Sequence, residues 1–555
     1  MKVSYRILFL IGVAIQLFSF HADAQLMKGK DQFTRADSLR GTLTPYRTAY
    51  DIQYYHLEVK ADIENRLISG SNLFKFKAVK DFNRLQFDLF AALQVEKVVY
   101  KNKELNFQRE ENAVFVDFPV TIKKGVVDSF KVFYSGAPRV AKNAPWDGGF
   151  VYSSDANGKP WVSTANQGLG ASSWWPNKDH QSDEVDSMLI SISVPSKLMD
   201  ISNGRLRSKT ELKDGYTRYD WFVSNPINNY SVSMNIGDYV HFGDTLHGER
   251  GILDIDYWVL RDNLKKAKVH FSKNVKPMLK AFEYWFGPYP FYEDSYKLID
   301  APYLGMEHQS AVTYGNQYAN GYLGKDASGT GWGLKWDFII IHESGHEWFG
   351  NSITAKDLGD MWIHEAFTNY AESLFVEYQF GKAAGQEYVH GNRRGILNDS
   401  PLQGPFGVNK EGSGDMYLKG GVFLNMLRTI IDNDTRWKSI LRGLNKEFYH
   451  KTVDYKDIEN YISQQSGIDL SNVFAQYIQH STIPTLEFRM ENGKLWGRWI
   501  ADIPEFDMPV RVRVKGGEYR MIKPSTHFSE INIKGIDSET IEVDTFNYYI
   551  GILFN

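Results

Sequence analysis

The sequence predicts a multidomain α+β protein with a β-sandwich-like N-terminal domain, a mostly helical middle domain and a small C-terminal β-sandwich. Its 555 residues are too many for one hydrophobic core at roughly 150 residues per domain. Hydrophobic residues make up 43% and charged residues 23% of the chain, a composition typical of packed globular proteins. The hydrophobic period changes along the chain from two residues to three or four, and then back to two.

The domain boundaries follow from these changes of period. Residues 46–240 contain short alternating stretches such as YHLEVKADI and MLISISV between Gly, Asn, Asp and Pro, which predicts a β domain. In residues 241–480, from about residue 255, apolar residues recur every three or four positions, as in NVKPMLKAFEYWFG, which predicts a mostly helical domain. Residues 481–555 return to alternation in TLEFRM, VRVRV and ETIEV, which predicts the small β-sandwich.

Residues 1–24 have the pattern of a secretory signal peptide. Lys2 and Arg6 come before the apolar run ILFLIGVAIQLFSF, and the small residues Ala22 and Ala24 follow it. The run of about 14 apolar residues is shorter than the roughly 20 that span a bilayer, which disfavours an uncleaved anchor. We therefore expect an exported protein, periplasmic or secreted, without a membrane partner after cleavage.

Composition excludes several partners and cofactors. Sixty-three Lys and Arg against 67 Asp and Glu give a formal net charge of -4, so nucleic acid is not an expected partner. The chain has no Cys, which removes disulfides, thiolate metal sites and thiol nucleophiles. A metal site must therefore use His, Asp or Glu.

The motif HESGH predicts a metal site on a buried helix. His342 and His346 are four residues apart, about 6 Å along a helix, which is close enough to bind one tetrahedral zinc. The flanking segments FIII and WF are apolar nearly all round, which predicts burial. Glu343 is one step round the helix, where it can act on a water without being a metal ligand.

The next predicted helix offers a third ligand. We expect it to begin at Asp357 or Asp360 and to end at Gly381. Its predicted core stripe is Ile363, Phe367, Tyr370, Leu374 and Tyr378. Glu365 lies off this stripe and would complete a two-His, one-Glu ligand set with one position open. Glu372 is about 10.5 Å further along the axis, where it either orients a ligand His or is a solvated charge.

Four motifs in order resemble the aminopeptidase N family of zinc metallopeptidases, the gluzincin aminopeptidases. HESGHEWFGNSIT with MWIHEAFTNYAE resembles the family's zinc signature, and LGMEHQSAVTYG resembles its exopeptidase motif. GDMYLKGG resembles the segment with the catalytic tyrosine, and STANQGLGASSWWP resembles the substrate-binding strand. The resemblance covers about residues 46–555. It implies one zinc per chain, a thermolysin-like catalytic domain and a short form without the family's C-terminal helical domain.

The resemblance also implies roles for further residues. Glu307 would bind the free α-ammonium of a peptide, with Gly305 and Met306 beside it in the same substrate-binding motif. Tyr417 would donate a hydrogen bond to the oxyanion of the transition state. Gln167 would stand at the substrate-binding position of the β domain.

The sequence departs from the family's pattern in three places. His308 and His364 stand where the family commonly has Asn, and Gly345 stands between the two ligand histidines where a bulkier residue is usual. Gly345 should weaken its helix by about 1 kcal/mol relative to Ala and would allow close packing. Ser413 and Asp415 are expected to cap the helix that carries the catalytic tyrosine.

These observations imply a zinc-dependent aminopeptidase that hydrolyses the N-terminal residue from peptides, with Glu343 as the general base. Two alternatives stay open at this point. One is a thermolysin-like endopeptidase, because the ligand set alone does not separate terminal from internal cleavage; Glu307 is the residue that discriminates. The other is a catalytically silent, exported peptide-binding protein, against which the retention of Glu343 and Tyr417 argues.

Overall fold

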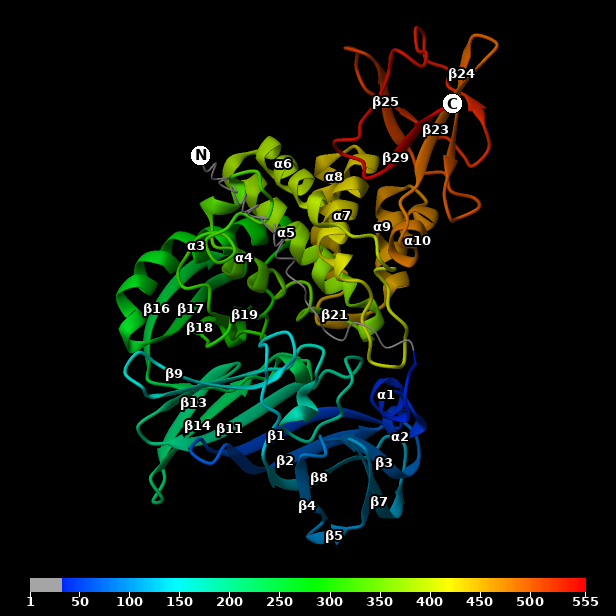
Figure 1. The fold of residues 1–555 in the computed structure, drawn as a ribbon. Helices are drawn as coiled ribbons and strands as arrows, with labels where there is room; N and C mark the ends of the chain where they lie inside the picture. Colours follow the sequence, from blue (N-terminus) through cyan, green and yellow to red (C-terminus); the bar gives the residue numbers. More distant parts are fainter. Residues whose placement is uncertain (1–31) are drawn as a thin grey trace, which may run out of the picture.

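The computed structural model describes residues 32–555, which form three bodies stacked along the long axis of the molecule (Figure 1). A β-rich N-terminal body lies at the bottom of the view, a helical body in the middle and a second β-rich body at the top. The α+β multidomain class predicted from the sequence is confirmed. The predicted signal peptide, residues 1–24, lies outside the described residues.

The N-terminal body is built from three sheets. Its elements are α1 (Arg35–Gly41), α2 (Pro45–Thr48), β1 (Tyr50–Asp62), β2 (Leu67–Ala78), β3 (Phe82–Asp88), β4 (Leu93–Tyr100), β5 (Lys103–Leu105), β6 (Phe107–Glu110), β7 (Ala113–Ile122), β8 (Val127–Gly136), β9 (Gly149–Ser154), β10 (Pro160–Ala165), η1 (Ala171–Ser173), β11 (Ser187–Pro195), β12 (Met199–Ile201), β13 (Arg205–Glu211), β14 (Tyr216–Val223), η2 (Asn229–Ser231) and β15 (Asn235–Gly237). The strand orders are β13-β14-β11-β1-β2-β8-β4-β5, β3-β7-β6 and β12-β15-β10-β9. Their alternating apolar residues pack into a hydrophobic core that also includes Ile299 and Ala311 of the middle body.

The middle body begins with a five-stranded sheet and continues with helices. Its strands are β16 (Tyr239–Gly248), β17 (Gly251–Leu260), β18 (Tyr296–Asp300), β19 (Gly305–Met306), β20 (Val312–Tyr314), β21 (Ile353–Ala355) and β22 (Lys451–Val453). Its helices are η3 (Arg261–Asn263), α3 (Leu264–Phe286), η4 (Tyr292–Asp294), η5 (Trp332–Lys335), α4 (Phe338–Gly345), η6 (Leu358–Asp360), α5 (Trp362–Phe380), α6 (Lys382–Asn392), η7 (Arg393–Gly395), η8 (Gly414–Met416), α7 (Leu418–Ile431), α8 (Asp434–Glu447), α9 (Tyr455–Ser466) and α10 (Ser471–Gln479). Helix α5 lies at the centre, in contact with α3, α4, α6 and α7.

The five-stranded sheet, in the order β16-β17-β18-β20-β19, is the main departure from the predicted helical domain. Sequence reasoning missed β18 because it is buried at all five positions and shows no alternation. Strands β16 and β17 do alternate, but they lie beyond the predicted end of the β domain at residue 240. The sheet places its short edge strand β19 against α4, so that residues 305–307 lie beside the HESGH helix.

Helix α5 ends at its C-cap residue Gly381 as predicted, but it differs from the predicted helix at its start and in the exposure of its last turn. It starts at Trp362, because Asp357 caps the short helix η6 that comes before it. Tyr378, expected in the core stripe, is 42% exposed, whereas the other four residues of that stripe are buried. The last turn of α5 lies at the surface, where the ring of Tyr378 packs against the exposed ring of Tyr284.

The C-terminal body contains two small sheets with the orders β27-β24-β23-β29 and β26-β25-β28. The strands are β23 (Thr485–Glu491), β24 (Lys494–Ile500), β25 (Val510–Val514), β26 (Arg520–Ile522), β27 (Ser529–Glu530), β28 (Ile541–Val543) and β29 (Gly551–Phe554). Buried residues of this body, such as Trp499 and Phe488, belong to the same hydrophobic cluster as the helices of the middle body. The two bodies therefore pack together.

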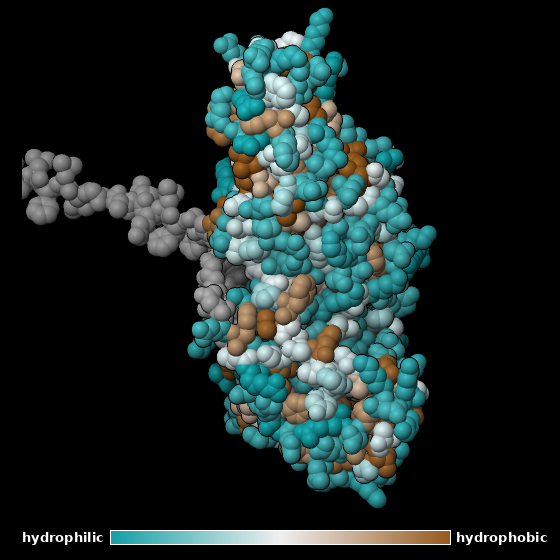
Figure 2. Space-filling view, turned by 90° about the vertical axis from the view of Figure 1, so that its right-hand side faces the viewer, coloured by the Kyte–Doolittle hydropathy of each residue, from teal (hydrophilic) through white to brown (hydrophobic). Residues whose placement is uncertain are grey.

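The face of the molecule drawn in Figure 2 is mostly hydrophilic, with small hydrophobic patches scattered between polar regions. Within residues 32–555, every helix is too short or too polar to cross a bilayer.

Candidate metal centre

Helix α4 holds the two predicted histidine ligands in a buried position. Asp337 caps its start by accepting hydrogen bonds from the backbone N–H groups of Ile339 (3.0 Å) and Ile340 (3.2 Å). The helix ends at Gly345, but His346 keeps right-handed helical backbone angles, so His342 and His346 still face the same side. The predicted burial of this helix is confirmed.

Glu365 in the first turn of α5 brings the third predicted ligand to the two histidines. Glu365 Oε2 lies 3.6 Å from His342 Nε2 and 3.3 Å from His346 Nε2. Three ligand atoms about 2.1 Å from one tetrahedral zinc would be about 3.4 Å apart. Glu365 Oε2 is buried and has no hydrogen-bond partner among the described residues. The donor set and its spacing therefore fit one zinc ion.

Both histidines are oriented by hydrogen bonds from the ring nitrogen that faces away from the centre. His342 Nδ1 donates to Glu372 Oε1 at 2.8 Å, and His346 Nδ1 donates to the backbone oxygen of Phe349 at 3.0 Å. Because the acceptors carry no proton, the protons are on Nδ1 and both Nε2 lone pairs are free for a metal. Glu372 is fully buried and also accepts from Tyr388 (2.7 Å), so it is not a solvated charge.

Glycines bring other elements close to these side chains. A Cβ added at Gly345 would lie 3.1 Å from a methyl carbon of Thr368, whose hydroxyl is 3.1 Å from His346 Nδ1. A Cβ added at Gly305 would lie 3.2 Å from Glu343 Oε1. These two positions are therefore sites of close helix–helix and strand–helix approach, as the sequence suggested for Gly345.

Glu307 follows β19 and its carboxylate faces the same centre. Glu307, Glu343 and His346 each offer an atom to a group that spans no more than 4.8 Å. Glu307 Oε1 is buried without a hydrogen-bond partner in the described chain. Its backbone oxygen accepts from Asn351 (2.8 Å), and Asn351 accepts in turn from Ser231 of η2 (2.9 Å). The N-terminal body therefore helps to fix the position of Glu307.

The N-terminal body contributes two more side chains. Gln167, in the loop after β10, donates from Nε2 to Glu365 Oε1 at 2.9 Å, so it contacts a ligand carboxylate. Tyr230 of η2 is buried and its hydroxyl has no partner among residues 32–555. Burial and the nearby Glu307 raise the pKa of Tyr230 well above its ordinary value. Sequence reasoning missed Tyr230, because nothing in its local sequence shows that domain packing brings it here.

Tyr417 stands at the start of α7, and its ring stacks on His342 with 6.0 Å between centroids. Burial and Glu365 raise the pKa of Tyr417 well above 10, so the phenol keeps its proton. Ser413 caps the short helix η8 before α7, by accepting from the N–H of Asp415 at 3.0 Å, and not the helix of Tyr417 itself, whose start has no side-chain cap. Asp415 does not cap the helix. Its carboxylate instead accepts from the backbone N–H groups of residues 397 and 398 and fixes that loop.

The two histidines that replace the family's usual Asn are buried and serve the local structure. His364 Nε2 accepts a hydrogen bond from the backbone N–H of Ala355 at 2.8 Å, which ties α5 to β21. His308 Nδ1 is 3.4 Å from Thr313 Oγ1. Burial lowers the pKa of each histidine to about 3, so both are neutral at physiological pH.

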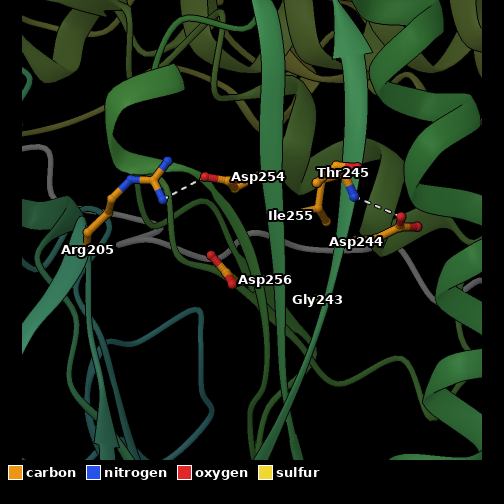
Figure 3. A pocket seen from close by; sticks show the side chains of 7 residues that line it. All are labelled: Arg205, Gly243, Asp244, Thr245, Asp254, Ile255 and Asp256. Atoms are coloured by element: carbon orange, nitrogen blue, oxygen red, sulfur yellow. Dashed lines mark hydrogen bonds and ion pairs between the residues drawn. The ribbon is translucent and has the colours of Figure 1, made fainter.

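Two of the hollows among the described residues lie away from this centre. One, of about 440 Å³, lies where β16 and β17 meet Arg205, which pairs with Asp254 at 2.9 Å (Figure 3). The other, of about 600 Å³, lies behind Trp348 and is lined by Arg250 and Arg442 among others. No residue of the metal centre lines either hollow. The candidate site is therefore identified by the clustered His and Glu side chains and not by a cavity.

Comparison with known proteins agrees with this constellation. Residues 51–230 match the peptidase M1 N-terminal domain, and residues 271–477 match the peptidase family M1 domain. Endoplasmic reticulum aminopeptidase 1 of Mus musculus is 25% identical over 320 residues, which are 55% of this chain and 34% of that protein. Probable aminopeptidase 1 of Saccharolobus solfataricus is 22% identical over 424 residues, covering 72% of this chain and 52% of that protein. The chain thus spans between a third and about half of these relatives.

A solved structure has the same fold over nearly all of its own length. An M1 zinc metallopeptidase from Deinococcus radiodurans, bound to a Tyr-Ser-Ala substrate, matches with a TM-score of 0.66 and 19% sequence identity. The match covers 80% of this chain and 98% of that one. With both M1 domains in order along the chain and a His-His-Glu zinc site between α4 and α5, this protein belongs to the peptidase M1 family.

Proposed function

We propose that this protein is a zinc-dependent aminopeptidase that removes the N-terminal residue from peptides with a free N-terminus. Glu307 carries the proposal, because its unpartnered carboxylate oxygen groups with Glu343 and His346 within 4.8 Å. An α-ammonium bound there would hold the first peptide bond of the substrate beside the base and the zinc ligands. Cleavage would then occur one residue from the end. The aminopeptidase relatives support this reading.

The chain's own residues would perform the proton transfers. Zinc held by His342, His346 and Glu365 supplies Lewis acidity toward water and the scissile carbonyl. Glu343 takes a proton from the attacking water and returns it to the nitrogen of the leaving amine. Burial raises the pKa of Glu343 to about 7, although His342 opposes the shift.

Other side chains would stabilise the transition state and hold the ligands in place. The hydroxyl of Tyr417 donates to the carbonyl oxygen as negative charge develops on it. Gln167 holds the second oxygen of Glu365 through its 2.9 Å hydrogen bond. Glu372 holds the ring of His342 through its 2.8 Å hydrogen bond.

We expect blocking the substrate's N-terminus to lower kcat/KM at least tenfold. An N-acetylated peptide lacks the cation that Glu307 would bind and leaves this buried carboxylate unpaired, which costs about 1.5 to 3 kcal/mol. The measurement is kcat/KM for one peptide in its free and acetylated forms. Equal cleavage of both forms, or cleavage of internal bonds alone, would establish an endopeptidase instead.

Glu307→Ala provides the matched variant for this experiment. It should weaken cleavage of the free peptide and narrow the difference between the free and acetylated forms, because the ammonium no longer has a partner. Glu387→Gln removes an exposed carboxylate from α6 and serves as a control for the change in net charge. A free-to-acetylated ratio that is the same in Glu307→Ala and wild type would remove Glu307 from ammonium binding.

We propose further that the protein acts after export, in the periplasm or outside the cell. The support is the pattern of residues 1–24, with its basic start, apolar run and small residues before Gln25. Mass spectrometry of the protein from fractionated cells should find a mature chain that begins at Gln25. Recovery of the uncleaved chain from the cytoplasm alone would contradict the proposal.

A further inference from the structure

Glu411 is a buried carboxylate near the zinc ligands that no step of the proposed reaction uses. Its side chain lies in the loop between η7 and η8, and the residue is only 8% exposed. Its Oε2 atom is buried and has no hydrogen-bond partner among the described residues. Buried polar atoms in folded proteins are nearly always satisfied, so an unsatisfied one beside an active site points to a ligand.

The backbone on both sides of Glu411 is held in place. The side chain of Asn409 donates to the backbone oxygen of Gly168 at 3.3 Å, directly after Gln167. On the other side, the N–H of Ser413 donates to the backbone oxygen of Pro401 at 2.8 Å. A Cβ added at Gly404 would lie 2.5 Å from the carbonyl carbon of Glu411, so these backbones are in contact. The carboxylate is therefore presented from a fixed loop.

Glu411 lies near a zinc ligand and the predicted catalytic tyrosine, since it interacts electrostatically with Glu365 and Tyr417. Glu307 interacts with the same two residues, but it also groups with Glu343 and His346 within 4.8 Å, and Glu411 does not. Glu411 belongs to neither set of described residues that could hold a metal ion. An organic cation is therefore the ligand that fits.

We propose that Glu411 binds the ammonium or guanidinium group of a substrate side chain next to the scissile bond. Peptides with Lys or Arg at that position would then be preferred substrates. This inference rests on the proposed aminopeptidase function and adds a substrate class to it. Two carboxylates near the zinc ligands would then bind two cations, with Glu307 on the α-ammonium and Glu411 on the side chain.

The test compares basic with neutral residues of similar length at two substrate positions. Amides of Lys, Arg, Met and Gln vary the first residue, and dipeptide amides Ala-Lys and Ala-Met vary the second. Wild type and Glu411→Gln are measured with each substrate. We expect Glu411→Gln to lower kcat/KM for basic substrates about 10- to 100-fold, while neutral substrates change by less than about threefold. If the loss appears with the single-residue amides, Glu411 contacts the side chain of the first substrate residue. If it appears with the dipeptide amides, Glu411 contacts the side chain of the second.

The controls distinguish a change in substrate specificity from a loss of folding, and they test the role of Glu411 independently of the proposed aminopeptidase activity. Glu411→Gln keeps the shape of the side chain, and its zinc content and Tm are compared with those of wild type. Calorimetry in the inactive Glu343→Gln protein, with and without Glu411→Gln, measures Kd for lysinamide and methioninamide without turnover. Equal loss for basic and neutral substrates, or no loss, overturns the role of Glu411. A wild-type protein that hydrolyses no amide overturns the proposed function, and calorimetry still decides the role of Glu411.

Discussion

Chelation is expected to abolish peptide hydrolysis, and one equivalent of zinc per chain is expected to restore it. The predicted ligands His342, His346 and Glu365 converge with atom spacings of 3.3 and 3.6 Å around one point. Without the ion, nothing there lowers the pKa of the attacking water from about 15.7 towards 7. The expected loss is therefore several orders of magnitude and exceeds the effect of any single hydrogen bond in the site.

Three measurements check this expectation. Elemental analysis of dialysed, active protein gives the zinc content per chain, and titration of the chelated protein with zinc gives the stoichiometry of recovery. His346→Ala should lose zinc and activity together while still melting cooperatively, because its imidazole contributes little to either hydrophobic core. Fully active protein without a transition metal would exclude the zinc mechanism.

Tyr417→Phe is expected to lower kcat and kcat/KM together by about 10²- to 10³-fold. Removal of one hydrogen-bond donor to an oxyanion typically costs about 2.7 to 4 kcal/mol, because the bond strengthens only in the transition state. The ring would remain stacked on His342 in the variant, so zinc binding and stability should be nearly unchanged. The effect should therefore appear in the chemical step and not in KM.

Steady-state kinetics on one amino-acid amide measures this effect. Tyr378→Phe, which removes an exposed hydroxyl at the end of α5, is the matched control. If kcat of Tyr417→Phe equals that of wild type, Tyr417 is a packing residue of the start of α7 and the oxyanion needs another donor. Tyr230 would then be the next residue to test, because its buried hydroxyl also lacks a partner among residues 32–555.

The metal centre was predictable because its ligands are fixed by local geometry. His342 and His346 are separated by one helical turn, and Glu365 lies near the start of the next helix. Helical spacing sets where such side chains point, whatever the rest of the chain does. The seven-residue separation of Glu372 from Glu365 placed it on nearly the same face of α5, but the sequence left open whether it orients a ligand His or is solvated, and its burial and its bond to His342 decide this.

Residues brought in by long-range packing could not be predicted in the same way. Tyr230 and Glu411 reach the centre only through contacts between parts far apart in the chain, such as Ser231 with Asn351 and Asn409 with Gly168. Gln167 was expected among substrate-binding residues, but its hydrogen bond to Glu365 depends on the docking of two domains. The exposure of Tyr378 depends likewise on where neighbouring helices end, which the period of α5 does not encode.

The hydrogen bond from Gln167 to Glu365 links the zinc site to the N-terminal domain, which also shares buried apolar contacts with the middle domain through Ala165, Tyr230, Ala301, Tyr303 and Met306. Asn351 forms a second link, because it connects Ser231 of one domain to the backbone of Glu307 in the other. A rotation between the two domains would lengthen these two bonds and would also disturb the apolar contacts that the domains share. Any change in how the domains dock would therefore move Gln167 relative to the ligand carboxylate, so activity depends on the packing between the domains as well as on the zinc ligands.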